Sequence, residues 1–259
     1  MSAEHGNLTA HAGTTEADEG EVLERDAAAD VRAFYLQAAF RALLDAMARP
    51  GELAQLPEVP RSVAAEAERA GIDASSLMLA DVLLDAATSF SVAGARADEL
   101  ERAVAGRTHA SVRHAEDAAF TFVGTDVRGD EAKRAVLAAP AGTLVAPHLG
   151  ATIIVVAGTL LGLDERGSRT GSSSGADRQG TYVLSGPGVD GTATVTLDRT
   201  DVMQARAERA DEFPCGVDLV FVDGAGHVAA IPRSTTVEAA DAAGAANASD
   251  TEGGTAWAM

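Results

Sequence analysis

The sequence lacks the residues on which several common kinds of site depend. It contains one cysteine, Cys215, among 259 residues, which excludes a disulfide framework and any zinc or iron–sulfur site built from several cysteines of this chain. Lys133 is its single lysine, and Ala132 precedes it, so there is no phosphate-binding loop that ends in Gly-Lys. Pyridoxal phosphate needs a lysine for its Schiff base, and Lys133 lies among charged residues of an expected surface helix. We therefore predict no such cofactor.

Basic charge and long apolar runs are scarce as well. The 20 basic residues face 39 acidic ones, a net charge of −19, and such a chain repels nucleic acid and anionic membranes. The longest apolar run, residues 151–161, is too short to cross a bilayer. Residues 1–30 have no apolar stretch of the kind found in a signal peptide. We predict a soluble cytoplasmic protein without a nucleic-acid or membrane partner.

Acidic residues concentrate at both ends of the chain. Residues 1–30 hold eight acids against one base, and residues 238–259 hold four acids and no base. Both segments are poor in large apolar side chains, as mobile tails are. The sequence thus predicts an acidic N-terminal tail over 1–29, a folded domain over 30–237 and a C-terminal tail over 238–259.

Between the tails, apolar periodicity predicts a series of helices and strands. The first helix carries Phe40, Leu43, Leu44 and Met47 at i, i+3, i+4 and i+7, the spacing of a core-facing stripe. The stripe extends one register back through Val31, Phe34, Tyr35 and Ala38. The Gly/Ser-rich stretch 162–180 is typical of a flexible surface loop. The expected helices cover residues 31–48, 76–87, 97–105, 130–138 and 201–209. The expected strands cover residues 89–93, 119–123, 151–158, 181–185, 192–197, 217–222 and 227–231.

The order of these elements indicates the fold class. Helices alternate with strands in the first half of the domain, whereas hairpins dominate the second half. The run 151–158 is continuously apolar, as a central strand covered on both faces would be. Residues 217–222 and 227–231 flank a glycine-rich turn, a strong hairpin signal. We predict a three-layer α/β domain with a mixed sheet.

Two motifs that resemble cofactor or catalytic sites have simpler interpretations. Residues 186–191 (GPGVDG) match the dinucleotide pattern G-x-G-x-x-G, which needs a helix after the glycines. Residues 192–197 instead alternate with period two, so a hairpin turn is favoured. No histidine lies near Cys215 in sequence, which favours a small buried thiol over a nucleophile. The six histidines include no His-Glu-x-x-His spacing, and we predict no metal site.

Arg233 and Asp218 are the candidate substrate-binding residues. Arg233 follows the last expected strand and precedes three hydroxyl residues, Ser234, Thr235 and Thr236, a combination that could grip a phosphate or phosphonate. Asp218 lies near the start of an otherwise apolar strand. For Arg233 the alternatives are an ion pair with a carboxylate or a subunit contact. For Asp218 they are a loop cap or an ion pair with a nearby arginine. No residue is predicted to be catalytic.

Three segments in this order resemble the PhnH family of the bacterial carbon–phosphorus lyase system. They are residues 40–51 (FRALLDAMARPG), residues 142–152 (GTLVAPHLGAT), and residues 213–219 (FPCGVDL) continuing to 231–236 (IPRSTT). The resemblance implies a fold similar to the large domain of pyridoxal-phosphate-dependent transferases, without that cofactor. It also implies a homodimer when isolated, and a core complex with the subunits PhnG, PhnI and PhnJ.

The resemblance further implies a role in phosphonate breakdown. With PhnG, PhnI and PhnL, the family is required for an alkylphosphonate to displace adenine from ATP, giving ribose 1-alkylphosphonate 5-triphosphate. Because the residues offer no convincing nucleophile, metal set or cofactor loop, our hypothesis is an assembly subunit that is not catalytic alone. The alternative is a free-standing phosphonate or phosphate-ester transferase that uses Arg233 and Asp218.

Overall fold

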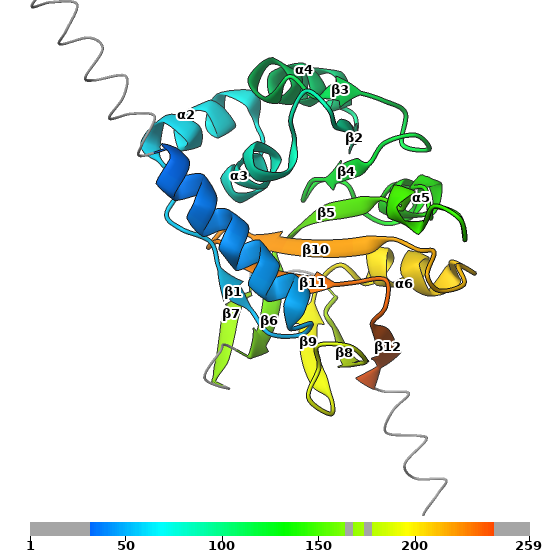
Figure 1. Cartoon of the computed structure of the whole chain (residues 1–259). Coiled ribbons are helices and arrows are strands. Elements are labelled where there is room, and N and C mark those ends of the chain that lie inside the picture. Colours follow the sequence, from blue (N-terminus) through cyan, green and yellow to red (C-terminus); the bar gives the residue numbers. More distant parts are fainter. Residues whose placement is uncertain (1–31, 164–167, 174–177, 241–259) are drawn as a thin grey trace, which may run out of the picture.

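The structure is a computed structural model that describes residues 32–163, 168–173 and 178–240. It is an α/β fold with a seven-stranded mixed sheet and a separate five-stranded antiparallel sheet (Figure 1). The predicted α/β class and mixed sheet are therefore confirmed, while the likeness to pyridoxal-phosphate-dependent transferases stays a prediction. Most of both predicted tails lies outside the described residues. The last strand, β12, ends at Ala239, two residues past the expected domain boundary.

The mixed sheet has the strand order β1-β11-β10-β5-β4-β2-β3. Strands β10, β5, β4, β2 and β3 run parallel, and β11 and β1 add antiparallel pairs at one side. The carboxyl ends of β5 and β10 therefore share one edge of the sheet, and their amino ends share the other. The strands are β1 (Ala54–Gln55), β2 (Ser89–Ala93), β3 (Ser111–Val112), β4 (Phe120–Val123), β5 (Thr152–Ala157), β10 (Asp218–Asp223) and β11 (His227–Ile231).

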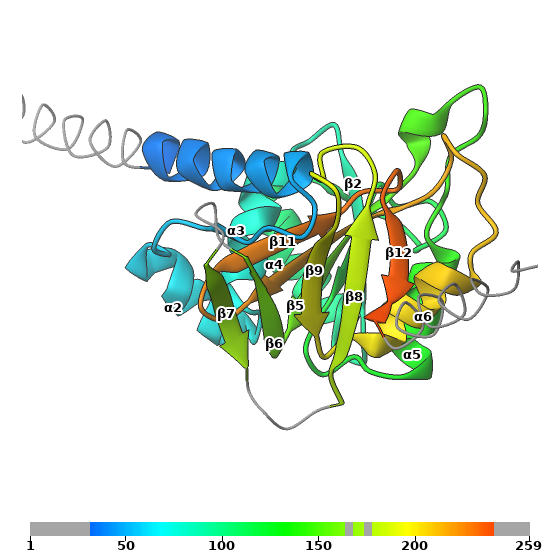
Figure 2. The same cartoon turned by 90° about the horizontal axis from the view of Figure 1, so that it is seen from below.

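Helices and the second sheet cover the two faces of the mixed sheet (Figures 1 and 2). One face carries the N-terminal helix, described over residues 32–48, with α2 (Arg61–Ala70), α3 (Ala74–Leu83) and α4 (Ala97–Thr108). The other face carries α5 (Asp130–Ala138), α6 (Thr200–Glu208) and the antiparallel sheet. That sheet comprises β6 (Thr159–Leu163), β7 (Arg169–Ser173), β8 (Gly180–Ser185), β9 (Ala193–Leu197) and β12 (Thr236–Ala239). No helix within the described ranges combines the length and apolar character needed to cross a membrane.

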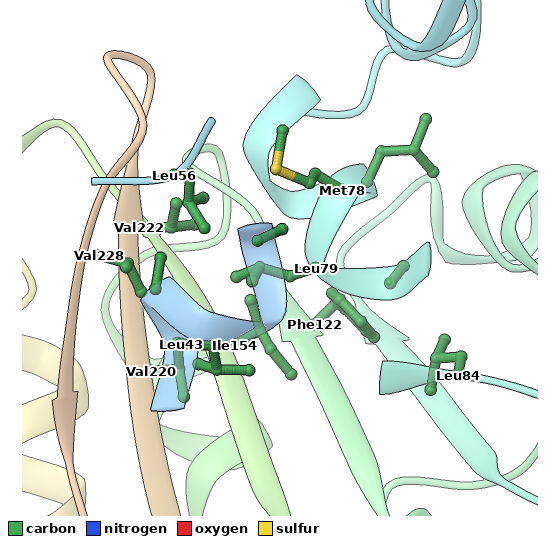
Figure 3. Packing of buried hydrophobic residues seen from close by; sticks show 14 of the residues in the cluster. Leu43, Leu56, Met78, Leu79, Leu84, Phe122, Ile154, Val220, Val222 and Val228 are labelled. Carbon is green, nitrogen blue, oxygen red and sulfur yellow. The ribbon is translucent and has the colours of Figure 1, made fainter. Parts of the chain in front are cut away.

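Two apolar clusters form the core, one on each face of the mixed sheet. Along β5, Ile154 and Val156 join the cluster under the helical layer, and Ile153 and Val155 join the cluster on the opposite face. Successive side chains of a strand point to opposite faces, so the unbroken apolar run follows from burial on both sides. Figure 3 shows the helical-layer cluster, in which Ile154 lies near Leu43 of the N-terminal helix.

The N-terminal helix forms where expected, but only part of the predicted stripe faces the core. Its buried stripe includes Tyr35 and Leu43, whereas Phe40 and Leu44 of the predicted stripe are 46% and 49% exposed. The predicted stripe was therefore wrong in part. The other buried positions are the small residues Ala39, Ala42 and Ala46. Small side chains let the helix approach the layer beneath it, an effect that a count of large apolar residues misses.

The stretch 162–180 is not a single loop. Residues Arg169–Ser173 form β7, which pairs antiparallel with β6 at the end of the second sheet. The prediction of one surface loop was wrong because an edge strand packs few apolar side chains and so resembles a loop in composition. Residues 164–167 and 174–177 lie outside the described part of the chain.

Helix α3 begins earlier than expected. We predicted residues 76–87 with a serine cap, but the helix covers Ala74–Leu83, and the Asp73 carboxylate accepts hydrogen bonds from the backbone N–H groups of Ser75 and Ser76. An aspartate at this position satisfies two N–H groups that the helix leaves unpaired. Asp73 is thus the N-cap.

Candidate functional site

Arg233 and Asp218 meet at the amino ends of β5 and β10. The guanidinium donates from Nη2 to Asp218 Oδ2 at 2.6 Å and from Nε to both carboxylate oxygens at 3.2 Å. The backbone N–H of Arg233 donates to Asp218 Oδ1 at 2.7 Å. The structure therefore brings the two predicted site residues together, and their contacts match the ion-pair alternative. Substrate binding by either residue stays a prediction.

Arg233 also fastens the loop that precedes β5. Its Nη1 donates to the carbonyl of Pro147 at 2.7 Å, and its Nη2 donates to the carbonyl of Gly150 at 3.2 Å. A Cβ added at Gly150 would collide with Arg233 Nη1 and with the carbonyl of Gly216. The close approach therefore requires glycine at this position. Arg233 joins the end of β11, the start of β10 and this loop into one unit.

A recess of about 170 Å³ opens beside this unit. Its lining residues come from the end of α6, the segment before β10 and the turn after β11. They are Arg206, Arg209, Asp211, Cys215, Gly216, Val217, Arg233 and Thr235. We call this site the amino-edge recess.

Two of the three arginines in the recess are occupied by protein oxygens. Arg209 pairs with Asp211 and donates from Nη1 to the carbonyls of Val136 and Ala139. Arg233 pairs with Asp218 as described. The charges of these two ion pairs cancel, so neither pair adds net charge to the recess.

Arg206 differs from its neighbours because it has no carboxylate partner within 4 Å among residues 32–163, 168–173 and 178–240. Its Nη2 donates to the carbonyls of Thr235 and Pro232 at 2.7 and 3.2 Å. Burial lowers the pKa of Arg206, and the charge of Asp218 opposes that shift in part. One half-buried cation therefore remains uncompensated in the recess.

Thr235 supplies a second unsatisfied group. Its side chain is buried, and its hydroxyl has no hydrogen-bond partner from any described residue. A buried hydroxyl without a partner costs free energy, and such a group in a folded protein needs an explanation. Sequence reasoning named Thr235 only as one of three hydroxyls and missed Arg206 and Arg209. Arg206 and Arg209 are three residues apart at the end of the expected helix, a spacing that places two arginines on the same helix face and could have indicated this site.

Cys215 also lines the recess and is half-buried, with its thiol free. The lining contains no histidine that could act as a general base and deprotonate the thiol. In the part of the chain that the structure describes, no group of three or more His, Cys, Asp and Glu residues is arranged to hold a metal ion.

Open α/β sheets usually bind ligands at the carboxyl ends of their strands. At the carboxyl ends of β5 and β10, buried charged side chains of the protein itself occupy this place. Arg199 is fully buried and donates to the carbonyls of Gly124, Val156 and Val127 at 2.7–3.1 Å. Asp198, also buried, accepts from the backbone of Gly158 and Thr159 and from Arg128. Burial lowers the pKa of Arg199, and Asp201 opposes that shift. This edge is closed by charges that bind each other and the backbone.

The same edge holds the carboxylate of Asp223, which is also buried. It accepts from the backbone N–H groups of Ala225 and His227 at 2.9 Å, and it contacts His227 Nδ1 at 2.8 Å and the hydroxyl of Ser172. These contacts close the turn between β10 and β11 and attach it to β7. Asp223 therefore has a structural role in this turn.

The dinucleotide-like segment 186–191 forms the turn between β8 and β9, which pair antiparallel from Leu184↔Ala193 onward. Gly186 and Gly188 have φ values of 122° and 83°, which other residues rarely adopt. The predicted hairpin turn is confirmed.

Comparison with family models identifies the family of the chain. The family model of PhnH, described as a bacterial phosphonate metabolism protein, matches residues 28–238. The chain belongs to the PhnH family. Membership gives this fold a role in bacterial phosphonate metabolism, and the match includes every residue of the amino-edge recess. No curated protein sequence in the comparison matches the chain.

Proposed function

We propose that this PhnH-family chain is a subunit of the carbon–phosphorus lyase core complex and binds PhnG, PhnI and PhnJ. In this role it is required with PhnG, PhnI and PhnL for forming ribose 1-alkylphosphonate 5-triphosphate from ATP and an alkylphosphonate, with adenine displaced. Its own contribution is to assemble and position other subunits. It is not catalytic alone, and when isolated it forms a homodimer.

The observation that carries this proposal is a set of exposed apolar side chains on the segments that two arginines of the amino-edge recess, Arg209 and Arg233, hold in place. Large apolar residues that remain in water at one place on a surface indicate a protein–protein contact. Five of them lie on the segments that Arg209 and Arg233 tie together, with exposures from 45% to 96%. This amino-edge patch consists of Leu137, Leu144, Val145, Leu149 and Phe213.

The segments that carry the patch are held in place by hydrogen bonds. Thr143 and Ala146 exchange two backbone hydrogen bonds, which form a tight turn that presents Leu144 and Val145. Gly216 N–H donates to the carbonyl of Ala141 at 2.9 Å and joins the two segments. Figure 2 shows them projecting together from one end of the molecule, in green and in gold to orange. A preformed apolar surface loses little conformational entropy when a partner covers it.

Co-purification tests the proposal. We would express the chain with PhnG, PhnI and PhnJ and compare Phe213→Ser with Phe34→Ser, an equally drastic change at a residue that is 73% exposed on the N-terminal helix. Phe213→Ser is expected to release the chain from the complex, and Phe34→Ser is expected to leave it bound. Retention of Phe213→Ser with loss of Phe34→Ser would move the interface to the helix and overturn the patch as docking surface.

The free-standing transferase is tested separately. Purified chain incubated with ATP and methylphosphonate is expected to release no adenine until the partner subunits are added. Adenine release by the chain alone, lost in Arg233→Ala, would favour the transferase over the assembly subunit.

A further inference from the structure

We propose that the amino-edge recess binds a tetrahedral phosphorus oxyanion, a phosphate or phosphonate group, through Arg206 and Thr235. The inference depends on the proposed function only for the identity of the anion. The case for a ligand comes from the geometry of the recess.

The charge of the recess favours an anion. Among the charged residues that line the recess, Arg209 is neutralised by Asp211 and Arg233 by Asp218. Arg206 has no carboxylate of the described residues within ion-pair distance. The recess therefore carries one excess positive charge inside a chain with a net charge of −19. A half-buried guanidinium without a counter-ion is costly. A bound anion would remove that cost.

The guanidinium of Arg206 keeps N–H donors for a ligand. Arg206 uses Nη2 for the carbonyls of Thr235 and Pro232. Those two bonds fix the guanidinium in place, and no described residue accepts from Nε or Nη1. Guanidinium N–H groups on adjacent nitrogens match the spacing of two oxyanion oxygens. Arg206 is thus oriented by two of its donors and has others left for a ligand.

The hydroxyl of Thr235 is a further donor for a ligand. It is buried, it has no partner among the residues that the structure describes, and Thr235 lines the same recess. The carbonyl of this threonine accepts a hydrogen bond from Arg206 at 2.7 Å, so the guanidinium is held against the backbone of Thr235. A third oxygen of the same anion would accept from this hydroxyl once rotation about the Cα–Cβ bond turns it toward the recess.

The size of the recess limits the ligand. Its volume of about 170 Å³ is well below the roughly 300–1,000 Å³ of pockets that hold drug-sized molecules. It suits an inorganic ion or the head of a small alkylphosphonate. A nucleoside would extend out of it. The recess adjoins the amino-edge patch, so a bound anion would lie next to whichever partner subunit covers that patch.

The test is calorimetric titration of the isolated full-length chain with inorganic phosphate and with methylphosphonate, at fixed chloride concentration. Saturable binding of one anion per chain is expected, and methylphosphonate binding more tightly than phosphate would indicate the phosphonate as the natural ligand. Tighter binding of phosphate would identify inorganic phosphate or a phosphate ester. Absence of saturable binding of either anion would overturn the inference.

Two variants and their controls locate the site. Arg206→Gln is expected to weaken binding at least about tenfold, the effect of losing a charge-assisted hydrogen bond. Arg69→Gln, which makes the same charge change at an exposed residue of α2, is expected to leave binding unchanged. Thr235→Val is expected to weaken binding several-fold without lowering the unfolding midpoint. Thr194→Val, at an exposed position of β9, serves as its control. Equal affinity in both recess variants and the parent would contradict the site.

The result of the anion-binding test can be distinguished from the result of the assembly test. Anion binding is measured without any partner subunit, and assembly is measured without added anion. A chain that assembles but binds neither anion would refute this inference alone. A chain that binds anion through Arg206 but does not join the complex would refute the assembly role alone.

Discussion

The two edges of the central sheet handle buried charge in opposite ways. At the carboxyl ends of β5 and β10, Arg199 and Asp198 are fully buried and every strong contact is made within the protein. At the amino ends, Arg206 lacks a carboxylate and Thr235 lacks a hydrogen bond among the described residues. Satisfied buried networks rigidify a fold, whereas unsatisfied groups indicate a site for something else. In this molecule the ligand-binding edge is therefore expected to be opposite to the usual one for open α/β sheets.

The largest expected effect on stability comes from disrupting the hydrogen bonds at the carboxyl ends of β5 and β10, which we call the closed edge. Arg199→Met removes the guanidinium that holds the carbonyls of Gly124, Val127 and Val156. We expect a loss of about 3–5 kcal/mol in the free energy of unfolding, because the partner groups stay buried without a donor. Urea unfolding measures it. Arg69→Met, at an exposed position, should cost no more than about 0.5 kcal/mol, and similar costs for the two variants would contradict the closed-edge account.

We call the amino ends of β5 and β10 the open edge. A substitution there is expected to affect stability less, and assembly more, than a substitution at the closed edge. Arg233→Met removes the clasp between Asp218 and the carbonyls of Pro147 and Gly150. We expect a loss of about 2–3 kcal/mol together with failure to co-purify with PhnG, PhnI and PhnJ. Arg199→Met chains that still fold should assemble normally. The comparison fails if Arg233→Met destabilises the chain yet assembles fully.

A matched pair of threonines sharpens the comparison. Thr159 lies at the closed edge, and its hydroxyl contacts that of Ser173 at 3.2 Å, while Thr235 at the open edge has no partner among described residues. Thr159→Val should cost about 1 kcal/mol, and Thr235→Val should be neutral or slightly stabilising. Thermal unfolding in a buffer without phosphate measures both. Equal costs would show that the Thr235 hydroxyl is satisfied in the free protein.

The smallest expected effect concerns pH and Asp73, the N-cap of α3. Burial raises the pKa of Asp73, its bonds from Ser75 and Ser76 oppose that shift, and the charge of Asp223 adds to it. A raised pKa means that the stability contributed by the protonated form is present at low pH and is lost as pH rises through the folded-state pKa. Asp73→Asn keeps a capping oxygen without the charge. Its stability relative to the parent should therefore improve between about pH 4 and pH 7. Urea unfolding at both pH values measures this, and a constant difference would contradict the raised pKa.

Much of the fold could be predicted from the sequence because local signals and packing agree. The apolar run of β5, the hairpin of β10 and β11, and the helix over Asp130–Ala138 all appear where the pattern places them. Predictions failed where packing overrides composition. Alanines, rather than Phe40 and Leu44, bury the N-terminal helix, and the polar strand β7 pairs at a sheet edge.

The site was predictable only in part. Arg233 and Asp218 could be named because each stands at the end of a strong strand, but their mutual ion pair is a tertiary contact between partners 15 residues apart in the chain. Arg206 carried no sequence signal of being uncompensated, because that property depends on which carboxylates the fold brings near it. Unsatisfied groups become visible only when all their neighbours are known.

Hydrogen–deuterium exchange of the chain, free and bound to PhnG, PhnI and PhnJ, tests the central claim most directly. The account predicts new protection of backbone amides in residues 141–150 and 209–216, which carry most of the amino-edge patch and its clasped segments, with little change at the carboxyl ends of β5 and β10. Protection confined to the N-terminal helix or to the carboxyl edge, with residues 141–150 and 209–216 unchanged, would contradict it.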